Sequence, residues 1–166
     1  MYWIPELGAA RLAISPGPQG GDLLEDEIRS LRAKAVDVLV SALTSEQIEE
    51  FDLVKEPEYC RENGIDFRSF PIPDHDVPNS YEDVRVLAEQ LSKDVLDGKT
   101  VVIHCLAGIG RSALLAACTL CVMGISPSRA FVLISRARGW NVPETELQRA
   151  WVERFAEKMQ VAKLVE

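Results

Sequence analysis

Short apolar runs alternate along the chain with longer stretches in which apolar residues recur every three or four positions. The short runs predict strands over residues 36–40, 65–70 and 100–103, and a short edge strand over residues 11–14. The longer stretches predict helices, caps included, over residues 22–34, 45–51, 56–62, 80–98, 112–123, 126–139 and 143–163. Strands that alternate with helices indicate an α/β fold with a central, largely parallel sheet flanked by helices.

Capping residues sharpen several of these boundaries. Thr44 and Gln47 have the spacing of a capping box, and Ser80 is followed by Asp83 at the reciprocal capping position. The one stretch rich in proline and glycine, residues 15–21, lies close to the N-terminus and predicts a surface turn. A chain of 166 residues without an internal linker is expected to form a single domain over residues 1–166.

Composition and charge narrow the classes of function. Hydrophobic residues make up 47% of the chain and charged residues 27%, which is typical of a globular protein. The net charge of −8 argues against nucleic acid or an anionic membrane as a partner, because both require a basic surface. No apolar run approaches the roughly 18 residues of a membrane span. The first residues lack the pattern of a secretory signal, so a cytoplasmic location is expected.

The chain has four cysteines, and without a secretion signal they are not expected to form a disulfide framework. Cys118 and Cys121 have C-x-x-C spacing inside a predicted helix, which places both on one apolar face. We interpret them as buried core thiols, with a metal or redox role as the alternative. Cys60 is expected to be structural or partly exposed.

The fourth cysteine lies in the segment with the clearest chemistry, H-C-L-A-G-I-G-R-S at residues 104–112. A β-branched apolar run leads into this loop and a helix follows it. A helix N-terminus that presents backbone N–H groups binds anions, and a thiol in that field loses its proton easily. Cys105 is therefore the expected nucleophile, and the planar fork of Arg111 suits two oxygens of a phosphate.

The other loop residues complete a phosphate cradle. Gly108 and Gly110 allow the backbone to turn its N–H groups inward. Ser112 is expected to donate its hydroxyl to the sulfur when the thiolate leaves, and His104 to orient the loop. The expected phosphate-binding residues are Leu106, Ala107, Gly108, Ile109, Gly110 and Arg111.

A phosphoester also needs a proton on its leaving oxygen, and general acid catalysis contributes roughly 10²–10⁴ in rate. The proline-bounded loop at residues 71–79 carries two aspartates that can supply it. We favour Asp74, which follows Pro73, over Asp76, although both can be ordinary turn residues. His75 lies between them and is expected to face solvent.

The pattern H-C-x-x-G-x-G-R-S resembles the signature loop of the cysteine-dependent protein tyrosine phosphatases. The short chain is similar to their dual-specificity branch, including the compact microbial members and the kinase-associated phosphatase type. The resemblance covers about residues 36–155 and implies a protein tyrosine phosphatase-like fold. In such enzymes the general acid lies on a mobile loop after a strand, and Pro73-Asp74 looks like that element. The reaction implied needs neither a metal nor a cofactor.

A further match lies at residues 144–148, E-T-E-L-Q, before the last predicted helix. This segment resembles the glutamine-bearing loop that positions the hydrolytic water in many tyrosine phosphatases. The chain departs from that pattern because its leading position is Glu144. Gln148 is the expected water-positioning residue, and Glu144 can equally be a carboxylate at a helix N-terminus.

The expected function is hydrolysis of phosphotyrosine in proteins, with phosphoserine and phosphothreonine left open, through a phosphocysteine intermediate. A phosphoprotein is the expected partner, and the sequence predicts no oligomeric state. One alternative is a phosphatase of phosphoinositides or other non-protein phosphoesters, although Leu106, Ala107 and Ile109 bring no positive charge to the loop. The other alternative is a catalytically silent module that binds phosphate, which loss of Cys105, Arg111 or the acid would favour.

Overall fold

The computed structural model describes residues 1–5, 7 and 11–165, with side chains described through residue 160. Its centre is a five-stranded sheet in the order β1-β2-β5-β3-β4. The pairings β2–β5, β5–β3 and β3–β4 are parallel, which confirms the predicted α/β fold with a largely parallel sheet. The strands are β1 (Tyr2–Trp3), β2 (Arg11–Ser15), β3 (Val38–Ser41), β4 (Asp66–Ser69) and β5 (Thr100–His104).

The prediction that residues 11–14 form an edge strand is wrong. Tyr2 and Trp3 pair antiparallel with Ile14 and Ala13, so that β1 forms the edge and β2 lies inside the sheet. A strand of two residues is too short to show a periodic pattern, which is why the sequence did not reveal it. The interior position of β2 explains its continuous apolar run, because both of its faces are buried.

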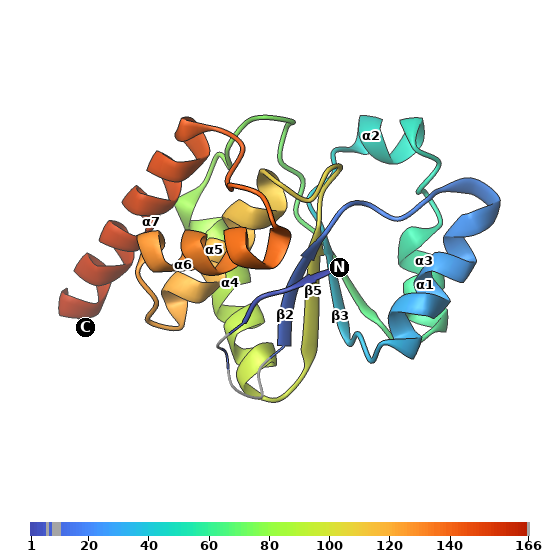
Figure 1. The fold of residues 1–166 in the computed structure, drawn as a ribbon, viewed down its shortest axis with the longest axis horizontal. Coiled ribbons are helices and arrows are strands. Elements are labelled where there is room, and N and C mark those ends of the chain that lie inside the picture. Colours follow the sequence, from blue (N-terminus) through green and yellow to red (C-terminus); the bar gives the residue numbers. More distant parts are fainter. Residues whose placement is uncertain (6, 8–10, 166) are drawn as a thin grey trace.

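Helices cover both faces of the sheet (Figure 1). Helices α4 to α7 pack together on one face, and α1 and α3 contact each other on the opposite side. The helices are α1 (Leu24–Ala33), α2 (Ser45–Glu50), α3 (Glu56–Glu62), α4 (Tyr81–Leu96), α5 (Arg111–Val122), α6 (Pro127–Arg138) and α7 (Glu146–Val165). Each side has its own apolar core, and the core on the α5 side is the larger.

Helix α5 is the centre of the larger core. Nearly all of its residues are buried, since it packs against α4, α6, α7 and the sheet. A helix that is apolar on all sides fits such a position and no surface position. Because α5 is held on every side, its N-terminus is fixed relative to the end of β5. None of the helices in the described ranges is long and apolar enough to cross a membrane.

Two predicted helices begin differently from expectation. Residues 21–23 form a 3₁₀ turn before α1, so the α-helix predicted from residue 22 begins at Leu24. The last helix begins at Glu146 rather than at Pro143. The predicted caps are present: Thr44 and Gln47 form the reciprocal capping box of α2, and the Ser80 side chain accepts from the Asp83 N–H.

The cysteines outside the loop also depart from expectation in part. Cys118 is buried as predicted, whereas Cys121 is only partly buried because it lies near the end of α5. Cys60 is fully buried, which fits the structural alternative of its prediction and not the partly exposed one. Burial, followed by the nearby charge of Glu56, raises the pKa of Cys60 to about 12. Burial also raises the pKa of Cys118 well above its usual value and that of Cys121 to about 12.

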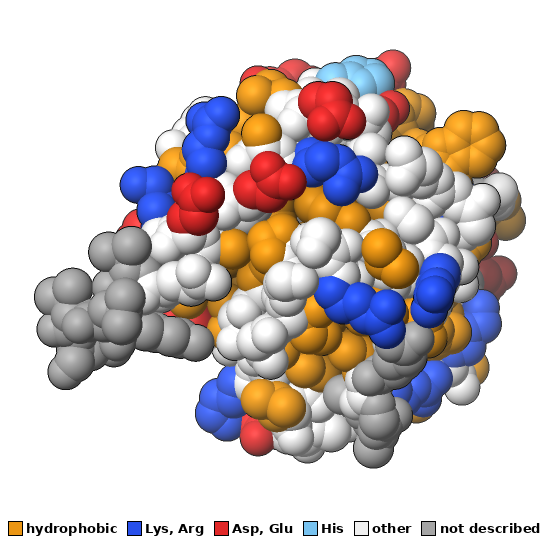
Figure 2. All heavy atoms as spheres, turned by 60° about the vertical axis from the view of Figure 1, so that its left-hand side comes forward, with side chains coloured by type: hydrophobic (Ala, Val, Ile, Leu, Met, Phe, Trp, Pro, Cys, Tyr) orange, Lys and Arg blue, Asp and Glu red, His pale blue; other side chains and the backbone are white. Residues whose placement is uncertain are grey.

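The surface on the α6 and α7 side carries charges of both signs. In Figure 2, Lys and Arg side chains alternate with Asp and Glu among apolar groups on the described part of this face. This face therefore provides no field of a single sign that would draw an anion toward the signature loop.

Candidate active site

The signature loop connects the central strand β5 to the buried helix α5. It lies at the carboxyl end of a parallel sheet, which is where such sheets bind ligands. Cys105 follows the last residue of β5 and Arg111 is the first residue of α5. Strand β3 lies beside β5 and ends at the same edge, so that the segment after it reaches the loop.

Cys105 is at the floor of the loop, with only 3% of its surface exposed. Its Sγ lies 3.3 Å from the Ser112 Oγ, at hydrogen-bond distance. Within the described part of the chain, the N–H groups of residues 106–110 donate to no backbone carbonyl. These free donors surround the N-terminus of α5 and provide the positive field expected from the sequence.

The loop conformation depends on Gly108. Its φ is +67°, and a β-carbon there would lie 2.6 Å from the Pro16 N and the Ser15 carbonyl carbon. The turn before α1 thus packs directly against the loop. The N–H of Gly17 donates to the Leu106 carbonyl at 3.2 Å and ties the two segments together. Any side chain at position 108 would push them apart.

Arg111 is 2% exposed and is held by the segments that follow β3 and β4. Its Nη1 donates to the Gln47 Oε1 at 2.7 Å and to the Ile72 carbonyl at 2.9 Å. Its Nη2 lies 2.9 Å from the Asp74 Oδ1, although this ion pair lacks the alignment of a hydrogen bond. One corner of the guanidinium is therefore anchored to the protein, while Nη2 keeps its donors for a ligand.

The two candidate acids face different groups. The Asp74 carboxylate is directed at Arg111 and is 41% exposed, so that it is accessible from solvent. Each carboxylate also accepts from the next N–H of its own loop: Asp74 Oδ1 from His75 at 3.2 Å and Asp76 Oδ1 from Val77 at 2.8 Å. Of the two, the geometry brings only Asp74 to the guanidinium and thus to the phosphate cradle.

His75 is 64% exposed, as expected, and lies between two carboxylates. Its Nε2 is 3.7 Å from the Asp74 Oδ2, and its Nδ1 is 3.4 Å from the Glu144 Oε2. These three side chains are the one group in the described ranges whose ligating atoms lie within 4.8 Å of one another. All three side chains are exposed. Their contacts connect the loop at residues 71–79, called the acid loop below, to the segment before α7.

Gln148 lies directly over the loop and is fully buried. Its Nε2 donates to the Asp76 carbonyl at 3.2 Å, and its Oε1 accepts from the Thr145 N–H at 3.2 Å. A β-carbon on Gly110 would lie 2.9 Å from both the Gln148 Nε2 and the Glu144 Oε2. Both alternatives for the water-positioning residue are thus beside the loop, and Gly110 permits their close approach.

Two site residues were not predicted from the sequence. Gln47 was recognised as a helix cap, but its side chain also holds Arg111. Arg138, at the end of α6, donates from Nε to the Gly108 carbonyl at 3.0 Å, and its guanidinium lies 4.3 Å from the centre of the Tyr2 ring. Nothing in the local sequence separates Arg138 from an ordinary basic residue in a last helical turn.

Comparison with known proteins agrees with this geometry. The rat (Rattus norvegicus) protein named cyclin-dependent kinase inhibitor 3 is 24% identical over 138 residues, which are 82% of this chain and 65% of that protein. The pig (Sus scrofa) protein of the same name is 31% identical over 98 residues, 58% of this chain and 46% of that protein. This chain therefore spans between about half and two thirds of these relatives.

A similar fold is found in the crystal structure of kinase-associated phosphatase in which the catalytic-site cysteine is substituted by serine. The two folds superpose with a TM-score of 0.85 at 20% identity, over 96% of this chain and 94% of the other. A sequence profile described as "Dual specificity phosphatase, catalytic domain" matches residues 32–156, which include the signature loop and the acid loop. The chain belongs to the family of dual specificity phosphatase catalytic domains.

Proposed function

We propose that this protein hydrolyses phosphomonoesters of phosphoproteins, on phosphotyrosine and also on phosphoserine and phosphothreonine. The observation that carries the proposal is the convergence of three groups on one loop: the Cys105 sulfur, the free N–H groups of residues 106–110 and the Arg111 guanidinium. A tetrahedral dianion suits such a cradle, because both the amides and the guanidinium donate to oxygen.

In the first step the Cys105 thiolate attacks phosphorus and the ester P–O bond breaks. The leaving oxygen takes a proton from Asp74, and the phosphoryl group is left on sulfur as a phosphocysteine. In the second step Asp74, now a carboxylate, takes a proton from a water molecule that attacks phosphorus. The S–P bond breaks, and the Ser112 hydroxyl at 3.3 Å donates to the departing thiolate.

Arg111 has a separate role in each stage. Before substrate binds, its Nη2 faces the Asp74 carboxylate, and the phosphate must replace that contact. The anchored Nη1 keeps the fork in place, so that substrate binding needs little rearrangement of the side chain. As charge moves onto the equatorial oxygens in the transition state, the fork binds them more strongly.

The attacking water needs a group that orients it above the loop. Gln148 is our choice, because its buried amide is fixed between the acid loop and Thr145 and touches Gly110. Glu144 approaches the same glycine and is the alternative. A Gln148→Ala variant that accumulates phosphocysteine would favour the first assignment.

Two observations support a phosphoprotein substrate. The side chains of Leu106, Ala107 and Ile109 bring no cation to the loop, whereas inositol polyphosphates favour additional positive charge. The relatives are named as a cyclin-dependent kinase inhibitor and a kinase-associated phosphatase, which also suggests protein partners.

The test compares the wild type with Cys105→Ser on three substrates: an aryl phosphate, a panel of phosphopeptides and phosphoinositide vesicles. We expect turnover of the aryl phosphate and the phosphopeptides by the wild type, and none by the variant. Faster turnover of phosphoinositides than of phosphopeptides would show that phosphoinositides, rather than phosphoproteins, are the substrate class. A wild type no faster than the variant on all three would leave a module that only binds phosphate.

A further inference from the structure

A buried carboxylate faces the histidine that precedes the nucleophile. Glu56 of α3 and His104 of β5 are each 1% exposed, and the Glu56 Oε1 lies 3.0 Å from the His104 Nε2. The Glu56 Oε1 and the His104 Nε2 lack the alignment of a hydrogen bond, so the two side chains form an ion pair by distance alone. Glutamate is seldom fully buried without a partner, since its desolvation is costly. The pair includes the first residue of the signature loop, and none of the steps proposed above uses Glu56.

The second ring nitrogen of His104 is directed at the nucleophile's own backbone. Its Nδ1 lies 3.5 Å from the Cys105 carbonyl oxygen. Both ring nitrogens therefore face oxygen atoms that accept. A neutral imidazole has one N–H and presents a lone pair at its other nitrogen, whereas the doubly protonated ring has a donor for each. The two contacts suit an imidazolium that faces an ionised Glu56, whereas a neutral ring would need a protonated Glu56 carboxyl to donate to it.

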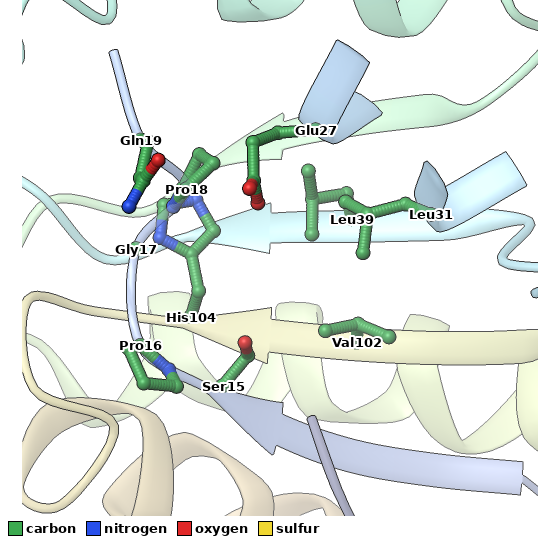
Figure 3. Close-up of a pocket in the computed structure, with 10 residues that line it drawn as sticks. All are labelled: Ser15, Pro16, Gly17, Pro18, Gln19, Glu27, Leu31, Leu39, Val102 and His104. Atoms are coloured by element: carbon green, nitrogen blue, oxygen red, sulfur yellow. The ribbon is translucent and has the colours of Figure 1, made fainter. Parts of the chain in front are cut away.

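A buried imidazolium requires a compensating anion, and Glu56 is within reach of it. Among the described residues, His104 is the one cationic group at ion-pair distance from the Glu56 carboxylate. Two further titratable groups lie near the pair: the thiol of Cys60, whose pKa the Glu56 charge raises, and Glu27 of α1, which lines a cavity with His104. Glu27 and His104 line one cavity of about 250 Å³, in which the ring stands against Gly17 and Pro18 (Figure 3).

We propose that Glu56 is a positioning residue for Cys105: it holds His104 doubly protonated and fixed against the Cys105 carbonyl, so that a buried positive charge lies behind the nucleophilic sulfur. The inference rests on the proposed function, in which Cys105 is the nucleophile. Glu56 touches no reacting atom and acts through His104 alone. A positive charge behind the loop favours the thiolate over the thiol, in addition to the free N–H groups of the loop.

The first experiment measures alkylation of Cys105 by iodoacetate in the wild type and in Glu56→Gln, with peptide mapping by mass spectrometry. Peptide mapping separates alkylation at Cys105 from alkylation at the other thiols. Those thiols are also expected to react slowly, because burial raises the pKa of Cys60, Cys118 and Cys121. Glu58→Gln is the matched control, since Glu58 is an exposed glutamate of the same helix. We expect the rate in Glu56→Gln to fall about ten-fold at about pH 5.5 and to stay unchanged at about pH 9, where the thiolate forms in any case.

A double-variant cycle tests whether Glu56 acts through His104. If it does, Glu56→Gln has no further effect on the alkylation rate at about pH 5.5 when His104→Asn is already present. Additive losses would show that Glu56 acts independently of the histidine and would overturn the proposal. An unchanged rate in Glu56→Gln, equal to that of Glu58→Gln, would overturn it as well.

A third measurement reads the protonation of His104 in the wild type and does not depend on a Glu56 or His104 variant. The chain has two histidines, so ¹⁵N-labelling of the imidazole rings gives two sets of signals, and His75→Asn assigns them. We expect both His104 nitrogens to have imidazolium shifts at about pH 7.5. A neutral tautomer of His104 at that pH would contradict the inference. A wild type that does not turn over an aryl phosphate would instead contradict the proposed function.

Discussion

Arg111 combines more functions than any other single residue of the site. Its Nη1 is used by Gln47 and the Ile72 carbonyl, which leaves the rest of the planar fork for two phosphate oxygens. A lysine has the charge but a single nitrogen, and cannot reach the anchors and the ligand together. We therefore expect turnover to depend on the geometry of the guanidinium rather than on its charge.

Arg111→Lys should reduce kcat/KM for an aryl phosphate by about 10²-fold or more, as for the loss of a fixed donor to a transition-state oxygen. Steady-state kinetics measure this loss, with far-ultraviolet circular dichroism as a check on folding. Gln47→Ala removes one anchor but keeps the fork, and should lose less. Near-normal turnover by Arg111→Lys would show that charge alone suffices.

Asp74→Asn should lower kcat and remove the basic limb of the pH–rate profile, because the amide has no proton to give. The loss is expected to be about 10²-fold or more for a substrate whose leaving group is an alkoxide, and much smaller for a good leaving group such as a nitrophenolate. Asp76→Asn is the matched control, since the Asp76 carboxylate serves the N–H of Val77. If Asp76→Asn flattens the profile instead, the assignment of the acid is wrong.

At the scale of elements, the loop between β5 and α5 is shaped by segments far away in the sequence. The turn at Pro16, the end of α6 at Arg138 and the segment before α7 all contact it. The sequence predicted the strand, the loop and the helix, because their patterns are local and the signature has fixed spacing. It did not predict that Gln47 holds Arg111, that Arg138 contacts the loop or that β1 forms the sheet edge. These features depend on contacts that only the folded chain brings together.

Gly108→Ala tests the contact between the loop and the turn before α1. Its φ of +67° strains any side chain, and the added methyl group would also meet backbone atoms at 2.6 Å. Gly64→Ala is the matched control, with a φ of +69° and nothing within 4 Å. Both variants should lose about 1–2 kcal/mol of stability from the positive φ. Only Gly108→Ala should also lose turnover, and equal activity of the two variants would contradict this account of the loop.

At the scale of the whole molecule, one partly buried ion-pair network joins the sheet to α4. The Asp94 carboxylate accepts from the Lys99 Nζ at 2.7 Å and lies 2.7 Å from the Arg68 Nη2 of β4. Burial by itself raises the pKa of Asp94, but these two cations lower it overall. Surface pairs of the chain, such as Lys93 with Asp97, contribute less because solvent screens them.

The lowered pKa of Asp94 predicts how stability depends on pH. Folding is favoured by the ionised form, so the stabilisation is complete above the carboxyl's ordinary pKa of 3.8 and is lost as the pH falls through the lower, folded-state value. Asp94→Asn should lose about 1–3 kcal/mol at neutral pH and show a shallower acid transition in urea unfolding. Asp97→Asn, at the C-cap of the same helix, should change little. An equal effect of the two would contradict the network.

In the proposed reaction, Cys105 carries the phosphoryl group between two half-reactions. Acid quenching during turnover of an aryl phosphate, followed by peptide mapping under acidic conditions, detects such an adduct most directly. We expect one phosphoryl group on the Cys105 sulfur, present only while substrate is being consumed. Turnover with an unmodified Cys105, or turnover that survives Cys105→Ser, would contradict it.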